Sequence, residues 1–355
     1  MNRNPWFDNI KGFLVIFVVI GHMLTDLRFD YDGKLLETVY LVIYSFHMPL
    51  FIILSGYFFR ENKYLHVIQL FAVYCVWQIL IGSWATFGEG LPLLSGQNLG
   101  THLLRPYWAL WYLFVMVVWY IVTPYVIHLR GYVWFGLAFA LLYGFELENT
   151  GFLALRKLIM FYPYFLLGNY LSEHEFIRIF EMPKSFKRRM NVRLIGGLAF
   201  ASVVGFLLYE AWRDTPQEIV ALANAFKHRF PYVEQYDSDA WVGVLKHSVI
   251  YFLSITASLG FMMLVPMRRL PLVTRAGELS LYVYLLHVFF VMAWRQYVTT
   301  AFVPQTWLAL LIVIGVALLI VGVIIHPLIV RLMRPLIEID IRPIVEERQD
   351  LSKKG

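Results

Sequence analysis

The stretch FDNIKGFLVIFVVIGHMLTD, residues 7–26, combines the length of a membrane helix with a stripe of ionisable residues. An apolar run separates Asp8 and Lys11, near its start, from His22, near its end. At about 100° per residue, Lys11 and His22 fall within roughly 20° of one helical face, and Asp8 and Asp26 lie on the same side. Ionisable groups inside a membrane are costly and usually face a cavity or a partner. This stripe therefore predicts the functional site.

The composition is that of a polytopic membrane protein. The 355 residues are 59% hydrophobic and 15% charged, with a mean hydropathy of +0.63, whereas a soluble domain averages about 25% charged residues. Counting about 20 apolar residues per span predicts an all-α protein with ten membrane helices. These helices are expected at residues 10–27, 38–59, 64–87, 107–129, 132–145, 152–171, 192–209, 241–265, 278–297 and 306–332.

The distribution of lysine and arginine predicts the orientation. With a cytoplasmic N-terminus, 20 of the 30 basic residues fall on the cytoplasmic side, as the positive-inside rule requires. We therefore expect a multi-pass protein of the cell membrane with both termini in the cytoplasm. Residues 1–335 form the expected transmembrane domain, and residues 336–355 form a short charged cytoplasmic tail. The longest outer loop, residues 210–240, is polar and could lie over an outward-facing mouth.

Several function classes lack their signatures. The single cysteine, Cys75, can form neither an intrachain disulfide nor a CxxC metal site. No compact ligand spacing such as HExxH occurs, so no metal is expected, and no phosphate-binding loop or dinucleotide fingerprint appears. The basic residues lie in short loops without a nucleic-acid-binding module, which argues against nucleic-acid partners. No cleavable signal peptide is expected.

Two further histidines lie deep within predicted spans, at depths comparable to that of His22. His47 belongs to SFHMPLF, where Pro49 would loosen the helix, and His287 belongs to LYVYLLH. Either histidine could be catalytic or could be a structural hydrogen-bond partner. Asp26, one turn beyond His22, could orient its imidazole or could be an exposed residue at the helix end.

Three other features admit two interpretations each. Ser55 in LSGY could be a nucleophile, but close helix packing at the Ser-Gly pair is favoured because no GxSxG elbow accompanies it. Trp108 and Trp111 suit an interfacial aromatic belt, and part of this stretch could line a sugar site. Arg105, at the same end, is either a snorkelling anchor or a substrate contact, with the anchor favoured.

Four motifs in order resemble the acyltransferase-3 family of integral membrane acyltransferases, and most closely its fucose O-acetylase-like branch. They are Lys11 and His22 with ten intervening residues, HMPLFIILSGYFF at 47–59, LWYL at 110–113 and LYVYLLH at 281–287. The resemblance covers residues 7–334 and includes the ten-helix count. The family's commonest residue at the Lys11 position is arginine, whose planar fork lysine lacks.

The resemblance implies transfer of an acyl group, usually acetyl, from cytoplasmic acetyl-CoA to a hydroxyl of a surface glycan or its lipid-linked precursor, without a permanently bound cofactor. His22, Asp26, His47 and His287 become the candidate catalytic residues. His22 would be a general base, worth about 10²–10⁴-fold, or a covalent acyl carrier. Some relatives carry a fused extracytoplasmic hydrolase-like domain, and no such domain is expected here. Either the membrane domain completes the transfer, or a separate extracytoplasmic partner does.

The cytoplasmic ends of the helices supply candidate contacts for the donor. Asp8 and Lys11 would position acyl-CoA or gate its path. The basic residues that could meet the phosphates of CoA, or that serve only to set the topology, are Arg60, Lys63, Arg268, Arg269 and Arg275. A different class of function also fits the intramembrane stripe. Aspartate, lysine and histidine can form proton relays, so a glycan or small-molecule transporter without covalent chemistry is the alternative.

Overall fold

The computed structural model describes residues 4–29, 34–61, 63–89, 103–147, 151–174, 186–236, 240–297 and 306–343. Within these ranges every regular element is a helix, so the expected all-α class is confirmed. The α-helices are α1 (Pro5–Leu27), α2 (Leu35–Tyr57), α3 (Tyr64–Glu89), α5 (Trp111–Val126), α6 (Tyr132–Tyr143), α7 (Leu155–Met160), α8 (Tyr162–Glu173), α9 (Phe186–Arg213), α10 (Pro216–Phe226), α11 (Tyr232–Tyr236), α12 (Ala240–Leu264), α13 (Pro271–Glu278), α14 (Ser280–Tyr297), α15 (Thr306–Ile324) and α16 (Pro327–Ile337).

The membrane character is confirmed by the long apolar helices. Among the described residues, seven helices are long and apolar enough to cross a membrane, or eight if α13 and α14, which meet at a 93° bend, count as one span. The seven are α1, α2, α3, the 3-10 helix η1 (Trp108–Leu110) continued by α5, α9, α12 and α15. The count of ten spans and the cytoplasmic termini stay predictions.

Two expected spans are broken. Residues 152–171 divide into a 3-10 turn (Phe152–Ala154), α7 and α8, and residues 306–332 divide into α15 and α16. Prolines accompany both breaks, because Pro163 lies in the first turn of α8 and Pro327 begins α16. Proline suits a first turn but cannot donate a hydrogen bond within a continuous helix. The expected domain boundary at residue 335 falls within α16, and residues 344–355 lie outside the described residues.

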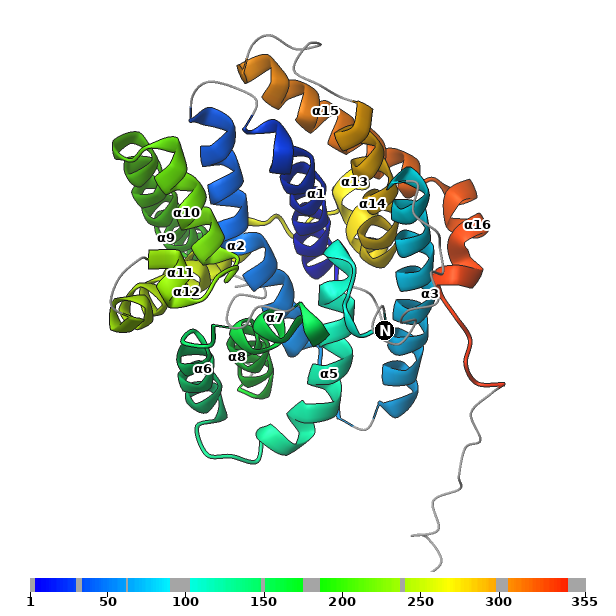
Figure 1. The fold of residues 1–355 in the computed structure, drawn as a ribbon, viewed down its shortest axis with the longest axis horizontal. Helices are drawn as coiled ribbons and strands as arrows, with labels where there is room; N and C mark the ends of the chain where they lie inside the picture. The colour runs from blue at the N-terminus through cyan, green and yellow to red at the C-terminus, as the bar shows by residue number, and fades with distance from the viewer. Residues whose placement is uncertain are drawn as a thin grey trace, which may run out of the picture.

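Helix α1 lies in the middle of the bundle, beside α2, α13, α14 and α15 (Figure 1). The side chain of Asn4 caps its N-terminus by accepting a hydrogen bond from the backbone N–H of Trp6, at 3.0 Å. The amide of Asn9 then donates to the carbonyls of Pro266 and Arg268, at 2.7 and 2.8 Å. These contacts fix the first turns of α1 to the segment between α12 and α13.

Helices α2 and α8 pack closely through glycine. A Cβ added at Gly56 would overlap the carbonyl of Phe165, and one added at Gly168 would overlap the carbonyl of Ile53. Small residues permit such backbone approach between membrane helices. The geometry therefore supports the packing interpretation of the Ser55–Gly56 pair.

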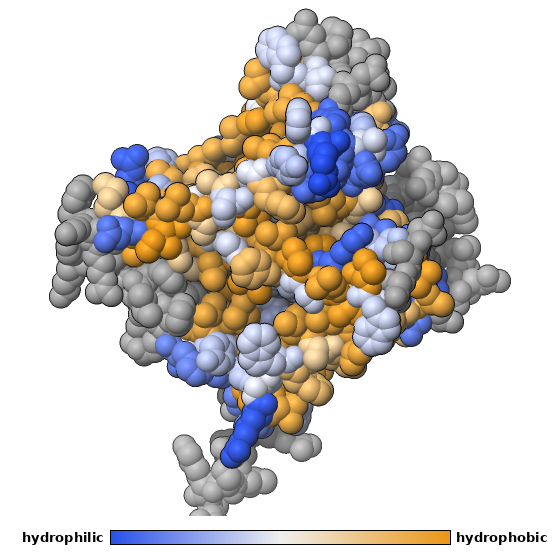
Figure 2. Space-filling model, turned by 90° about the vertical axis from the view of Figure 1, so that its left-hand side faces the viewer, coloured by the Kyte–Doolittle hydropathy of each residue, from blue (hydrophilic) through white to orange (hydrophobic). Residues whose placement is uncertain are grey.

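The outer surface of α9 and α12 is apolar. The exposed side chains there include Leu194, Leu198, Phe206, Leu245 and Phe252. Figure 2 shows the side of the molecule that carries these helices, with hydrophobic residues over most of the described surface. Such a surface is unfavourable in water and suits contact with lipid.

Residues 210–240, expected as a polar loop, contain two helices. Thr215 and Glu218 form a capping box at the start of α10. The buried side chains of α10 include Ile219, Ala223 and Phe226, and α10 packs against α2. Helix α10 is therefore built into the wall of the protein beside α2, because it has an apolar face to bury.

Candidate active site

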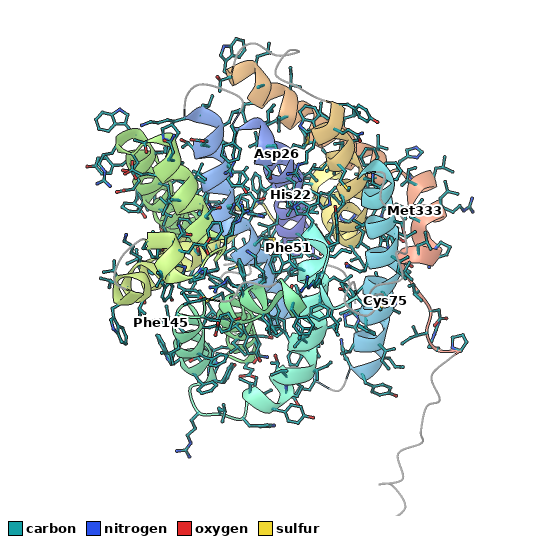
Figure 3. All side chains as sticks on the ribbon, in the orientation of Figure 1. His22, Asp26, Phe51, Cys75, Phe145 and Met333 are labelled. Atoms are coloured by element: carbon teal, nitrogen blue, oxygen red, sulfur yellow. The ribbon has the colours of Figure 1, made fainter. Side chains whose placement is uncertain are left out.

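The three intramembrane histidines converge. The rings of His22 on α1 and His287 on α14 stack with centroids 5.4 Å apart and planes 20° apart. Tyr44 on α2 connects the other pair, since its hydroxyl lies 3.5 Å from Nδ1 of His22 and its ring packs edge-on against His47 at 4.7 Å. Figure 3 shows His22 on α1 in the middle of the bundle. The folded chain thus places three imidazoles around one point.

Backbone carbonyls fix the tautomers of two of these histidines. Nδ1 of His47 lies 2.7 Å from the carbonyl oxygen of Ile43, and Nδ1 of His287 lies 3.0 Å from that of Val283. A carbonyl only accepts, so Nδ1 carries the proton and Nε2 of the neutral ring holds a lone pair. Nε2 of His287 is buried without a hydrogen-bond partner among the described residues. Both rings therefore present a basic nitrogen.

A cavity of about 260 Å³, here called the chamber, lies on one side of His22. A larger cavity of about 670 Å³, the vestibule, adjoins it and shares Trp108, Trp111, Lys157 and Arg229 in its lining. The remaining chamber residues are His22, Thr25, Tyr40, Tyr44, His47, Met48, Phe161, Phe226 and Lys227. Two of the three histidines thus face a space large enough for part of a small ligand.

A narrower route lies on the other side of His22. A cavity of about 30 Å³ shares His22, Met48 and Trp111 with the chamber. It shares Phe51 and Tyr112 in turn with a cavity of about 140 Å³. That last cavity reaches His66, near the start of α3, and Ser280, at the start of α14. We call these two cavities the passage. His22 is the histidine at the junction between the chamber and the passage.

Asp26 is connected to His22 through the side chains of Arg295 and Trp108. Its carboxylate forms an ion pair with Arg295 of α14, with Nη2 and Oδ1 2.7 Å apart. The guanidinium of Arg295 lies 5.2 Å from the ring centroid of Trp108, and Trp108 packs edge-on against His22 at 4.5 Å. Figure 3 shows Asp26 just beyond His22 on α1. Asp26 thus holds the arginine that covers Trp108, which in turn contacts the imidazole.

The predicted donor contacts gather around the start of α1. Nζ of Lys11 lies 3.0 Å from Oδ1 of the buried Asp8. Phe7 packs against Tyr57 and Phe58, at 5.4 and 4.9 Å between ring centroids, which brings the end of α2 to the same place. Neither Asp8 nor Lys11 lines any of the four cavities.

The basic residues at this end have different surroundings. Arg60 donates to the carbonyl of Phe59 at 2.7 Å, at the C-terminus of α2, and Lys63 is exposed. Arg268 and Arg269 are exposed just before α13, and Arg275 is exposed within it. Two of them pair with Glu278, Arg269 at 3.8 Å and Arg275 at 3.2 Å. The structure thus places all five at one end of the molecule.

The remaining candidate residues differ in whether they line the cavities. Trp108 and Trp111 line both the chamber and the vestibule, as the sugar-site interpretation requires. Arg105 is exposed and lines none of the four cavities. The hydroxyl of Ser55 lies 2.6 Å from that of Tyr112 and donates to the carbonyl of Phe51. The part of the chain that the structure describes contains no group of three or more metal-ligand side chains arranged for a metal ion.

Sequence reasoning missed five residues at the site: Tyr44, Lys157, Lys227, Arg229 and Arg295. The four basic residues among them could have been found from their position relative to the predicted membrane. Each belongs to the minority of basic residues on the predicted outer side, where the positive-inside rule makes lysine and arginine scarce.

The acyltransferase domain model of the acyltransferase-3 family matches residues 4–327. The chain therefore belongs to the acyltransferase-3 family. Two curated relatives are both named nodulation protein NolL. The one from Sinorhizobium fredii is 32% identical over 123 residues, 31% of this chain and 34% of that protein. The one from Mesorhizobium japonicum is 31% identical over 132 residues, 33% of this chain and 35% of that protein. The chain thus covers about a third of the length of these relatives. No solved structure matches.

Proposed function

We propose that this protein is an O-acyltransferase of the cell membrane that moves an acetyl group from cytoplasmic acetyl-CoA to a hydroxyl of a cell-surface or lipid-linked glycan. One observation carries the proposal: His22 lies at the junction of two cavity systems, the chamber and the passage. A donor and an acceptor that approach from opposite ends would meet at this imidazole. Residues 1–335 form the transmembrane domain that performs the transfer, and both termini are cytoplasmic.

The donor end is the start of α1. Lys11 and His22 are about 16 Å apart along the helix, at 1.5 Å per residue. A hydrogen bond spans about 3 Å, so the two residues do not form one acid–base pair. The extended pantetheine arm of CoA is long enough to bridge such a distance. Its phosphates would remain with Lys11 and the group formed by Arg60, Lys63, Arg268, Arg269 and Arg275.

The acceptor end is the vestibule. Its volume of about 670 Å³ lies within the usual range for a ligand site. Trp108 and Trp111 offer apolar ring faces against which a sugar can pack, and both reach the chamber that contains His22. A hydroxyl of that sugar would thus enter the chamber from the side opposite the passage.

The reaction transfers one acyl group and one proton. His22 accepts the proton of the acceptor hydroxyl, and the oxygen attacks the thioester carbonyl. A C–O bond forms, the C–S bond breaks, and the proton passes to the departing CoA thiolate. In the covalent variant, the imidazole takes the acyl group from CoA first and passes it to the hydroxyl afterwards. His287 supports the ring of His22 in either route, and His47 presents its Nε2 lone pair on the chamber side.

A comparison of cells with and without the gene tests the function. We expect loss of O-acetyl groups from the surface glycan, measured by mass spectrometry after mild alkaline release, with glycan export unchanged. Loss of export itself, with normal acetylation of the glycan that remains, would support a transporter instead. Purified protein that transfers labelled acetyl from acetyl-CoA to a glycan hydroxyl would establish the donor.

A further inference from the structure

Basic residues line the chamber and the vestibule on the side where they should be scarce, and one acidic residue, Glu146, lines the vestibule with them. Only ten of the 30 lysines and arginines lie on the predicted outer side. Four of these ten line the two cavities: Arg156, Lys157, Lys227 and Arg229. They come from α7 and from the segment after α10, so the fold brings together residues far apart in the sequence.

The two lysines lack acidic partners among the described residues. The ammonium of Lys157 donates to the backbone carbonyl of Lys227, and the ammonium of Lys227 donates to the hydroxyl of Tyr40 at 3.1 Å. No carboxylate in the described ranges forms an ion pair with either lysine. Both nitrogens therefore donate to neutral oxygens inside a cavity.

The surroundings disfavour a positive charge at Lys227. Burial lowers the pKa of its ammonium group to about 6, and the neighbouring cations Arg28, Lys157 and Arg229 contribute to this shift. A lysine ammonium group that is buried without an acidic partner costs free energy, and an anion placed beside Lys157 and Lys227 recovers part of that cost. The chamber is thus suited to an anionic ligand.

The wall of the vestibule offers unused hydrogen-bonding groups. The ring of His228 is buried, and neither of its nitrogens has a hydrogen-bond partner among the described residues. A neutral imidazole has one donor and one acceptor, which matches a hydroxyl group. Trp108 and Trp111 line the same cavity. Cations, aromatic faces and an unpartnered imidazole together suit an acidic saccharide.

We propose that the acceptor is an anionic saccharide whose carboxylate or phosphate binds between Lys157, Lys227 and Arg229 in the chamber. This inference rests on the proposed function and names its acceptor class. The bound anion would hold the sugar against Trp108 and Trp111 and direct a neighbouring hydroxyl toward His22.

Binding of three matched probes to purified full-length protein tests the acceptor class. The probes are a neutral hexose trisaccharide, the same trisaccharide with one uronate, and the same with one phosphate monoester. We expect at least one anionic probe to bind about tenfold more tightly than the neutral one, because hydrogen bonds to charged groups are the stronger ones. The affinities of the two anionic probes show whether the site prefers a carboxylate or a phosphate.

Variants assign the selectivity to the chamber. Lys157→Gln with Lys227→Gln should remove the tenfold preference. Lys246→Gln should keep it, because Lys246 is an exposed lysine of α12 outside the lining of both cavities. Equal binding of all three probes, or a preference that persists in the double variant, overturns the proposal. Weaker binding of acetyl-CoA in the double variant would also overturn it, by assigning the cations to the donor.

A transfer assay keeps the two proposals distinguishable. With labelled acetyl-CoA, the anionic probe that binds should become acetylated, and His22→Ala should prevent this. Charge-selective binding without transfer would leave the anion site standing and count against the proposed function. Transfer to neutral and anionic probes at equal rates would uphold the proposed function and refute the anionic acceptor.

Discussion

The imidazole of His287 stacks on that of His22, with ring centroids 5.4 Å apart and planes 20° apart. His287 is fully buried, whereas His22 lines both the chamber and the passage. The buried ring therefore supports the accessible one. In the proposed function, His22 meets the substrates and His287 orients the ring of His22.

His22→Ala should abolish acyl transfer, a loss of at least about 10²-fold, while the protein still inserts and accumulates. His22 is half-buried beside a cavity, so its removal opens little new space in the core. Activity is measured by acetyl transfer in membranes, and abundance by immunoblotting and size-exclusion profile. His174→Ala, at an exposed histidine, is the matched control and should remain active. Full activity of the His22→Ala variant would show that His22 takes no part in the reaction.

Asp26→Asn and Arg295→Gln should each lower the rate about tenfold and less than His22→Ala. The two side chains form one ion pair beside Trp108. Either substitution therefore breaks the same interaction. The double variant should be no worse than the single ones, because paired residues give non-additive effects. A double-mutant cycle on kcat measures this. Additive losses would show that Asp26 acts on His22 independently of Arg295.

Lys11→Arg should retain substantial activity, since it keeps the charge near Asp8. Lys11→Ala should lose most activity, chiefly through poorer use of acyl-CoA. The measurement is the rate against acetyl-CoA concentration in inside-out vesicles, for both variants and the parent. An unchanged donor dependence with a weakened acceptor dependence would reverse the assignment of the two ends.

Binding of the uronate probe should weaken as the pH rises above about 6. Below its free pKa of about 6, Lys227 already carries the charge that the anion needs. Above it, binding must take up a proton, so affinity falls by up to about tenfold per pH unit until the raised pKa of the complex is passed. The groups that face Lys227 are His22, Arg28, Tyr40, Tyr44, Lys157 and Arg229. Lys227→Arg stays charged and should bind with little dependence on pH, and an unchanged pH profile in this variant would contradict the assignment to Lys227.

Tags at the C-terminus and within residues 210–240 should report opposite sides of the membrane. The prediction follows from the asymmetry of 20 cytoplasmic to ten outer basic residues. Impermeant labelling of intact cells should reach the tag within 210–240 and leave the C-terminal tag unlabelled until the cells are opened. Labelling of both tags from outside would show that the predicted topology is wrong.

The sequence by itself determined the central helix and the class of fold. Residues 7–26 form part of α1, and the polar stripe lies on it because helical periodicity depends only on local spacing. Apolar composition likewise predicted long helices, although it did not place the breaks before α8 and α16. The sequence contains Pro163 and Pro327 at these breaks. From sequence alone, however, a proline in the first turn of a new helix cannot be distinguished from one that kinks a continuous span.

The tertiary structure decided which side chains meet His22. His287 arrives from α14, Tyr44 and His47 from α2, and Lys227 from a segment expected to be a polar loop. Asp26, adjacent in the helix, instead pairs with Arg295. Periodicity sets the face on which a residue lies, but the partner of that face depends on how helices distant in sequence pack, and packing is a property of the whole chain.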